Sequence, residues 1–426
     1  MRFHVPGVPH TVTNKRFLSC AYTQKVVKLC EMLINLGHTV YHYGCEGSDP
    51  KCTEHISIVT DEYRQKYYPD KFHTEQFRFD TADEFHQNFH KRCVEEIKKR
   101  MQPKDFLLCA WGWGHQPTAI QLPELMVVES GIGYPDVFSK YKVFESYTWM
   151  QYVYGKEKIG DGSWYDCVIP NYFDVRDFQY NDKKEDWFLY IGRIVKRKGV
   201  ELAAQVCEKM GKKLIIAGQG KITDPNENID LNLPHVEHVG FADVNKRKDL
   251  MSRAKGVFVP TYYVEPFGGV AIESQLSGTP VISTDWGVFS ETILQGVTGY
   301  RCRTFDQFCW AVENIDKCSP KACHEWAKTN YSMERVALMY QEYFEMLYDL
   351  WGEGWYARHP NRTNLDWNRR WFPIEATLSN QIVAASSVIT AVTTSAVENA
   401  PSPDAPINSA TLKNKVTLRN KRDWME

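Results

Sequence analysis

The chain has 426 residues, of which 43% are hydrophobic and 24% charged, so it has a globular composition and is long enough for two domains. Its 51 Lys and Arg against 53 Asp and Glu leave a formal net charge of -2, which gives no general attraction for nucleic acid. Twelve scattered cysteines without a C-x-x-C spacing, no secretory signal at the start and no long apolar run favour a cytoplasmic protein without a metal site or a transmembrane segment.

Short apolar runs alternate with helical patterns in the first half of the chain. The predicted strands are 1–5, 38–44, 105–111 and 125–130, and the predicted helices are 19–36 and 89–101. Such alternation predicts a parallel sheet covered by helices. The pattern breaks around Pro170 and Asn171, so we place the first domain at 1–170 and the second at 171–340.

The second half repeats this alternation. Its predicted strands are 187–192, 213–218, 256–260 and 280–284, and its predicted helices are 200–210 and a helix that starts after Phe267. We therefore expect an α/β protein with two doubly wound, Rossmann-like domains that face each other across a cleft.

The last part of the chain changes in composition. A long aromatic helix is predicted from Met333 to Trp351, and its aromatic residues and those that follow need a surface on which to be buried. Residues 376–426 are rich in small and polar residues and end in a basic segment, which predicts a disordered, low-complexity tail. The alternative for this tail is a tether to a membrane surface or to a partner.

Two glutamates frame a glycine-rich turn in the second half. Glu265 and Glu273 lie on either side of a segment that contains Phe267, Gly268 and Gly269 at a strand-to-helix turn. A helix that begins there points free N–H groups into the cleft and favours an anion, and the two glycines allow a diphosphate or its sugar to approach the backbone. Glu273 can then accept hydrogen bonds from both ribose hydroxyls, and Glu265 lies near the sugar. The alternative is a pair of surface glutamates beside a turn.

A basic loop follows the first strand of the second domain. Ligands bind outside the carboxyl ends of strands in doubly wound domains, so this loop should face the same crevice as the turn at 265–269. Arg193 and Lys198 could clamp two phosphates there, because both cations make charge-assisted hydrogen bonds. Lys196 and Arg197 are interpreted as a solvated charge run.

Other strand ends supply further candidates. Gly218 and Gly220 offer close backbone approach after the strand at 213–218. In the first domain His115 follows a predicted strand and should face the cleft, where it could contact sugar or phosphate; the alternative is a structural histidine. Glu129 and Ser130 end the next predicted strand and are weaker candidates for the same cleft.

These motifs together resemble the retaining glycosyltransferases of family 4, which have the GT-B fold. The resemblance runs from about 187 to 299 through YIGRIVKRKG, LIIAGQG, HVEHVGFAD and VPTYYVEPFGGVAIESQLSGTPVI, and it is much weaker before Pro170. It implies that residues 341–375 pack back on the first domain. The donor roles that it implies are diphosphate stabilisation by Arg193 and Lys198, ribose binding by Glu273, sugar contacts by Glu265, Phe267, Gly268 and Gly269, and base stacking near Val239 and Gly240.

The sequence departs from this family in two places. The first loop, where the family often has a glycine pair, reads PGVPHT, and the segment before Glu291 reads WGVFS in place of the usual Gly-Gly. Acceptor recognition therefore does not transfer from the family. The acceptor-side candidates are His10 and Thr11 in this loop, together with Glu129 and Ser130.

The expected activity is the transfer of a sugar from a nucleotide diphosphate, UDP rather than GDP, to a glycan or another hydroxyl acceptor with retention of configuration. The resemblance implies that the leaving diphosphate itself helps to deprotonate the acceptor. No D-x-D triplet occurs, so neither a metal nor another cofactor is expected. The alternatives are a nucleotide-sugar epimerase or a sugar phosphorylase on the same fold, or a non-catalytic binding protein. Nucleic acid is not an expected partner, peripheral membrane contact stays open, and the sequence does not give the oligomeric state.

Overall fold

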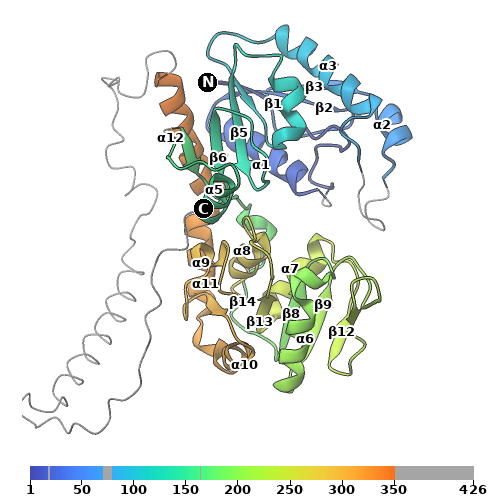
Figure 1. Ribbon diagram of the computed structural model, residues 1–426, viewed down its shortest axis with the longest axis vertical. Coiled ribbons are helices and arrows are strands. Elements are labelled where there is room, and N and C mark those ends of the chain that lie inside the picture. The colour runs from blue at the N-terminus through green and yellow to red at the C-terminus, as the bar shows by residue number, and fades with distance from the viewer. Residues whose placement is uncertain (18–19, 71–78, 164, 351–426) are drawn as a thin grey trace, which may run out of the picture. The chain divides into compact units, whose positions relative to one another are not determined.

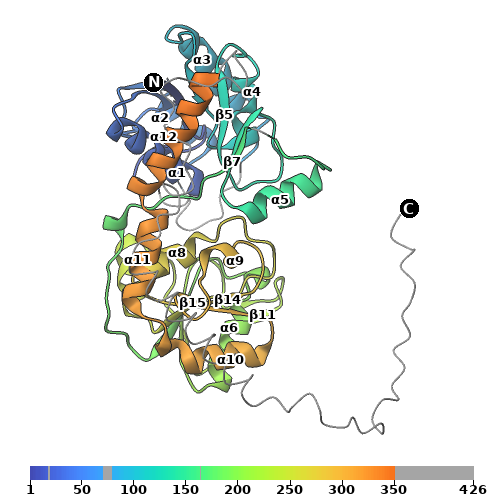
Figure 2. The same cartoon turned by 90° about the vertical axis from the view of Figure 1, so that its left-hand side faces the viewer.

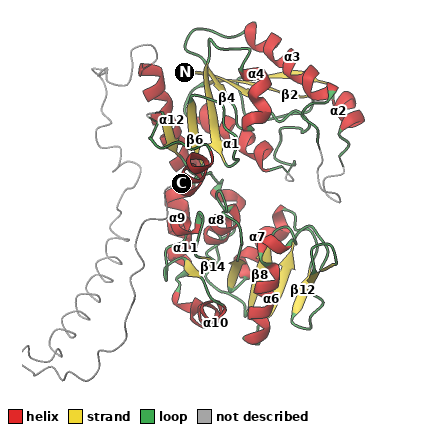
Figure 3. Ribbon diagram, viewed as in Figure 1, coloured by secondary structure: helices red, strands yellow, loops and turns green. Residues whose placement is uncertain are grey.

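The computed structural model describes residues 1–17, 20–70, 79–163 and 165–350. This part of the chain folds into two α/β domains, and in each of them helices lie on both faces of a parallel sheet (Figures 1 and 3). The prediction of two doubly wound domains is confirmed.

The first domain is built on a seven-stranded sheet with the strand order β3-β2-β1-β4-β5-β6-β7, in which every neighbouring pair is parallel. Its strands are β1 (Arg2–Pro6), β2 (Thr39–Cys45), β3 (Glu54–Val59), β4 (Phe106–Leu108), β5 (Met126–Ile132), β6 (Tyr141–Phe144) and β7 (Asp166–Val168). Its helices are α1 (Ala21–Asn35), α2 (Asp61–Tyr67), α3 (Glu84–Lys98), α4 (Gln116–Ala119) and α5 (Tyr147–Lys156), with a 3-10 helix η1 (Gly112–His115).

The sequence predicted four of these seven strands. β3, β6 and β7 were missed because each is short or partly exposed, so its apolar run is weak. Helix α3 shows the opposite case: Phe85, Phe89, Cys93 and Ile97 recur every four residues and are fully buried. Asp83 caps this helix, because its carboxylate accepts a hydrogen bond from the His86 N–H.

The second domain has a six-stranded parallel sheet with the order β12-β9-β8-β13-β14-β15. Its strands are β8 (Trp187–Ile191), β9 (Lys213–Ala217), β12 (Val236–His238), β13 (Gly256–Val259), β14 (Val281–Thr284) and β15 (Gly299–Cys302), and β10 (Thr223–Asp224) pairs antiparallel with β11 (Ile229–Asp230). Its helices are α6 (Val200–Lys209), α7 (Val244–Arg253), α8 (Gly269–Leu276), α9 (Phe289–Thr292), α10 (Phe305–Asn314) and α11 (Pro320–Tyr331), with 3-10 turns η2 (Val175–Asp177), η3 (Lys196–Lys198) and η4 (Ile315–Lys317). The predicted strands of this half are confirmed.

The chain crosses between the domains twice at one place. Phe173 lies on the outgoing crossing, and its N–H donates to the Tyr331 carbonyl at 2.9 Å. On the returning crossing the Met333 N–H donates to the Phe173 carbonyl, also at 2.9 Å. The two crossings thus run side by side through backbone hydrogen bonds.

Helix α12 (Met333–Leu350) continues from the second crossing onto the first domain, where Figure 2 shows it beside α1. Phe344 is fully buried there and its ring lies 4.8 Å from that of Phe3 and 5.2 Å from that of Phe106. Helix α12 thus packs on the first domain, as the resemblance implied for the segment that begins at 341, and the predicted boundary of the second domain at 340 stays a prediction. Residues 351–375 of the 341–375 segment and the 376–426 tail lie outside the described residues. None of the helices described is long and apolar enough to cross a membrane.

Candidate functional site

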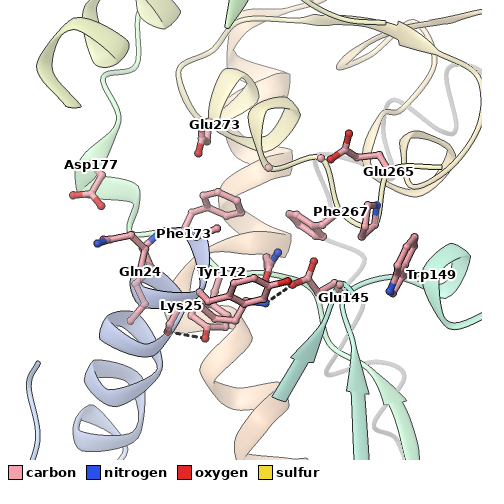
Figure 4. A pocket seen from close by; sticks show the side chains of 18 of the residues that line it. Gln24, Lys25, Glu145, Trp149, Tyr172, Phe173, Asp177, Glu265, Phe267 and Glu273 are labelled. Atoms are coloured by element: carbon pink, nitrogen blue, oxygen red, sulfur yellow. Dashed lines mark hydrogen bonds and ion pairs between the residues drawn. The ribbon is translucent and has the colours of Figure 1, made fainter. Parts of the chain in front are cut away.

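A cavity of about 1320 Å³ is lined by residues of both domains. The second domain contributes the loop after β8, the segment from Tyr263 to Gly269, and residues of α7 and α8. The first domain contributes residues of α1, the loop after β5, and the three residues Glu145, Trp149 and Tyr152 (Figure 4). The basic loop and the glycine-rich turn, which the sequence predicted to share a crevice, both line this cavity.

The glycine turn at the start of α8 forms part of the cavity wall. Gly268 precedes the helix with a φ of 68°, and a Cβ there would lie 2.8 Å from a ring carbon of Phe289. This position therefore requires glycine. Gly269 begins the helix and also lines the cavity, and a Cβ there would have the Phe173 ring as its nearest neighbour, at 3.6 Å. The free N–H groups of a helix start favour an anion at this wall.

Lys198 and Glu265 form an ion pair inside the cavity. The Lys198 Nζ donates to the Glu265 Oε2 at 2.8 Å, and the two side chains are only 22% and 12% exposed. Arg193, the second predicted phosphate clamp, lines the same cavity and its residue is exposed. The structure thus brings these three predicted residues together, while their roles stay predictions.

Arg197 also lines the cavity, and its residue is exposed, in agreement with its interpretation as a solvated charge. Its guanidinium lies over the ring of Tyr263 at 4.4 Å, and the Lys198 ammonium lies 4.9 Å from the same ring. An aromatic face attracts a cation, so Tyr263 holds both basic groups at one side of the cavity. The turn η3 is too short to show a helical spacing, so the sequence could not indicate that the Arg197 side chain faces the cavity.

Glu273 is paired with Arg247, which was not among the predicted site residues. The Arg247 guanidinium donates a hydrogen bond to the Glu273 Oε2, and both side chains line the cavity. Burial lowers the pKa of Arg247 from its ordinary value. Leu250 and Met251 are buried three and four residues further along α7, so helical spacing could have placed Arg247 on the packed face.

His115 does not line the cavity, contrary to the prediction that it faces the cleft. Its side chain is fully buried, and its Nδ1 accepts from the Trp111 N–H at 3.3 Å while its Nε2 lies 3.1 Å from the Gly7 carbonyl oxygen. Burial lowers the pKa of this imidazole to about 4, so the ring is neutral at pH 7. In this structure His115 joins two loops of the first domain.

The two acceptor-side candidates of the first loop are buried as well. His10 Nδ1 lies 3.1 Å from His86 Nε2, and its ring stacks on Phe79 with the centroids 4.4 Å apart. Thr11 shares its hydroxyl with that of Thr23 at 2.7 Å. Neither candidate lines the cavity. Both were chosen from their place in a loop, and the aromatic groups that cover them come from distant parts of the chain.

Glu129 and Ser130 lie inside the first domain rather than at the cavity. The Glu129 carboxylate accepts hydrogen bonds from the Tyr134 hydroxyl and from the N–H groups of Phe138 and Ser139, at 3.1, 2.9 and 2.8 Å. Burial raises the pKa of Glu129 above its ordinary value. Its carboxylate therefore organises the loop after β5, and Ser130 beside it is 1% exposed.

The glycines after β9 and β12 do not line the cavity in this structure. A Cβ at Gly218 would lie 1.8 Å from the Gly192 carbonyl oxygen, and one at Gly220 would lie 2.8 Å from the Ile194 Cβ. Backbone packing between neighbouring loops thus accounts for both glycines. The Gly218 N–H also donates to the Gly240 carbonyl at 2.9 Å, which fixes the loop that holds Val239. Base stacking near Val239 and Gly240 stays a prediction.

The first domain presents a charged pair that no sequence motif indicated. The Lys25 ammonium bonds the Glu145 Oε1, and it also donates to the Gly131 carbonyl at 2.8 Å. The Lys25 and Glu145 side chains are 8% and 7% exposed, and both line the cavity, as Figure 4 shows. These two residues are 120 positions apart in the chain, so no local pattern could have signalled the pair.

Helix α5 connects this side of the cavity to the second domain. The Glu291 carboxylate accepts hydrogen bonds from the Tyr147 and Thr148 N–H groups at 2.9 and 2.7 Å, which caps the helix start from the other domain. The Ser146 hydroxyl donates to the Pro266 carbonyl at 2.7 Å. The glycine-rich turn and the start of α5 are therefore held next to each other.

Among residues 1–350, apart from the few left undescribed, no three His, Cys, Asp or Glu side chains gather closely enough to hold a metal ion. The absence of a metal or other cofactor from the reaction stays a prediction.

Comparisons with known proteins match part of the chain to glycosyltransferases. Residues 173–333 match the model of the family described as glycosyl transferases group 1. A 140-residue stretch is 33% identical to an uncharacterized glycosyltransferase of Methanocaldococcus jannaschii, and it covers 31% of this chain and 36% of that protein. The chain thus spans about a third of the length of the curated relatives that it matches first.

Solved structures resemble more of the chain. Sucrose-phosphate synthase from Thermosynechococcus elongatus superposes with a TM-score of 0.60 and 17% identity over 82% of this chain and 100% of that chain. The Anabaena protein HepE in complex with UDP-glucose gives a TM-score of 0.56 and 13% identity over 82% of this chain and 100% of its own. These similarities confirm the predicted GT-B architecture of two Rossmann-like domains.

Proposed function

We propose that this chain, whose residues 173–333 match the group 1 glycosyl transferases, moves a sugar from a nucleotide diphosphate to a hydroxyl group with retention of configuration. The observation that carries the proposal is the shared cavity: the start of α8, Lys198, Glu265 and Glu273 all line it. A helix start and cations suit a diphosphate, and carboxylates suit the hydroxyls of a ribose and a sugar.

The donor would lie along the second-domain wall of the cavity. Its phosphates would face the N-terminus of α8 and the basic groups of Arg193, Arg197 and Lys198, which all line the cavity. Glu273 would hold the ribose and Glu265 the donor sugar. In the structure each carboxylate is paired with a cation, Glu265 with Lys198 and Glu273 with Arg247, so donor binding would exchange these pairs for contacts with the ligand.

The chemical step would need charge stabilisation more than a protein nucleophile. The bond between the anomeric carbon and the diphosphate oxygen breaks, and a bond to the acceptor oxygen forms on the same face of the sugar. The acceptor proton passes to the leaving diphosphate, whose developing charge is stabilised by the preorganised cations and the helix start. A uridine donor is the first to test, because the HepE structure of similar fold holds UDP-glucose.

A panel of UDP-, GDP-, ADP- and dTDP-sugars tests this function directly. We expect one nucleoside diphosphate to be released faster than from a protein-free blank, and NMR of the product to show the anomeric configuration of the donor. Release from none of the donors, with no nucleotide bound in calorimetry, would reject the proposed function. An inverted product would reject retention alone.

Excess EDTA is expected to leave the turnover of the nucleotide sugar unchanged. Basic side chains and the helix start would carry the charge that a bridging metal carries in other transferases. The measurement is the initial rate of diphosphate release with and without EDTA. Loss of the rate in EDTA and its recovery with Mg²⁺ or Mn²⁺ would contradict this expectation.

Replacing Glu273 by glutamine is expected to weaken the binding of UDP about tenfold, because hydrogen bonds from the ribose lose the charge of their acceptor. Isothermal titration with UDP measures the affinity, and the melting temperature checks the fold. Glu237→Gln is the matched control, since Glu237 pairs with Lys213 on the surface and does not line the cavity. Equal UDP affinities in the two variants would exclude Glu273 from the donor site.

A further inference from the structure

We propose that Glu145 and the stacked pair of Trp149 and Tyr152 form the acceptor subsite, and that the acceptor is a carbohydrate. This inference rests on the proposed function, since it names the second substrate of the same cavity. Glu145, Trp149 and Tyr152 all line the cavity from the first domain. They replace the buried His10, Thr11, Glu129 and Ser130, which the sequence suggested for the acceptor.

One oxygen of the Glu145 carboxylate is hydrogen-bonded to Lys25, and the other is available to a ligand. Its Oε1 bonds Lys25, whereas its Oε2 has no hydrogen-bond partner among the described residues. A Cβ at Gly133 would lie 2.6 Å from this Oε2, so the glycine leaves room for the carboxylate. A buried ion pair costs desolvation energy and is weak evidence for stability, so a ligand-binding role is the better explanation of this one. The free Oε2 can accept a hydrogen bond from an acceptor hydroxyl.

Two aromatic rings form a platform beside this carboxylate. The Trp149 Nε1 donates to the Tyr134 carbonyl at 3.1 Å, which fixes the orientation of the indole. The Tyr152 ring stacks on it with a centroid distance of 4.6 Å and an interplanar angle of 19°. Tyr152 is 43% exposed, so this ring is partly uncovered at the cavity. A sugar ring can pack its C–H groups on such an aromatic face while its hydroxyls reach polar partners.

The platform lies close to the proposed donor sugar. Ser146, which follows Glu145, donates its hydroxyl to the Pro266 carbonyl at 2.7 Å, and Pro266 follows Glu265. Figure 4 shows Glu145 and Trp149 on the side of the cavity opposite Glu273, near Glu265 and Phe267. A hydroxyl held by Glu145 would therefore lie where the donor sugar ends.

The chemistry of the first-domain wall favours a sugar over a lipid or an anionic acceptor. Its aliphatic lining residues are only Ala21, Val27 and Pro135, which is too little surface for an acyl or polyprenyl chain. Of its three lysines, Lys15 pairs with Glu31 and Lys25 with Glu145, so two of the three charges are compensated, and the Lys28 ammonium lies 5.3 Å from the centre of the Phe173 ring. Aromatic rings and hydrogen-bonding groups make up most of the rest.

In the test, the full chain is saturated with UDP and applied to a printed array of glycans. Two tyrosine variants are then compared with it on the glycan that the array retains. Tyr152→Ala is expected to lower the affinity for the retained glycan about tenfold, and to raise the KM for that glycan as acceptor by a similar factor. Tyr147→Ala is the matched control, because Tyr147 lies on the same helix, is 48% exposed and does not line the cavity. The Kd for UDP is measured in parallel to separate acceptor from donor effects.

The outcomes separate this inference from the proposed function. A glycan that binds more weakly to Tyr152→Ala and equally well to Tyr147→Ala supports the subsite. No glycan retained, or equal glycan binding by the two variants, overturns it. A chain that releases UDP but modifies only a peptide or a lipid also overturns the carbohydrate acceptor while the proposed function stands. Glycan binding through Tyr152 without release of any diphosphate would instead reject the transferase reaction.

Discussion

Replacing Lys198 by alanine is expected to lower the turnover of the nucleotide sugar by about 10² to 10³ while the protein stays folded. The Lys198 ammonium lies 2.8 Å from Glu265 and lines the same cavity as the start of α8, so the cation is already at the site before the donor binds. A preorganised cation acts most strongly on the charge that develops in the transition state. The loss should therefore be greater in kcat than in the Kd for UDP.

Lys196→Ala is the control for this variant. Lys196 belongs to the same short turn, but its residue is exposed and does not line the cavity. Initial rates and UDP titrations of both variants, with melting temperatures, separate catalysis from binding and folding. A rate in Lys198→Ala equal to that of Lys196→Ala would exclude Lys198 from charge stabilisation. A loss confined to the UDP affinity would make it a binding residue only.

Replacing Phe344 by alanine is expected to lower the free energy of unfolding by about 3 to 5 kcal/mol. Phe344 is fully buried between α12 and the first sheet, where its ring contacts those of Phe3, Phe106 and Tyr340. Removal of the ring would leave a cavity in a packed core, and neighbours on a helix and a sheet can close it only in part.

Leu338→Ala is the matched control, because Leu338 is on the same helix and 56% exposed. Urea unfolding followed by circular dichroism gives the free energy of both variants. We expect a change of less than about 0.5 kcal/mol for Leu338→Ala. Similar values for the two variants would mean that α12 contributes little to the stability of the first domain.

The sequence predicted those parts of the site that depend on short, continuous segments. Lys198 follows a strong apolar strand, and Glu265 and Glu273 flank a glycine turn before a helix, so strand-end placement sufficed to bring them to one crevice. The strands themselves were predictable where a run of apolar residues was long enough. The short strand β7 (Asp166–Val168) was not.

The parts of the site that were missed depend on contacts between distant segments. Glu145 meets Lys25 across 120 positions, and nothing in either segment indicates the other. His115 was assigned to the cleft from its place after a strand, yet its side chain is fully buried, and Glu129, assigned to a strand end, lies within β5 and is fully buried as well. Whether a polar side chain at a strand end is open or covered is decided by loop conformation, which a single sequence does not specify.

The double crossing at Phe173 and Met333 has a consequence for how the protein is made. The first sheet is complete in the chain once β7 has been synthesised, but α12, which covers Phe3 and Phe106, follows about 180 residues later. At ~5 to 20 residues per second this delay lasts roughly 10 to 40 s. The second domain consists of one continuous segment of the chain, so it can complete its fold before the first domain does. The nascent first domain would expose an apolar face during that interval, when it is most open to chaperones and to aggregation.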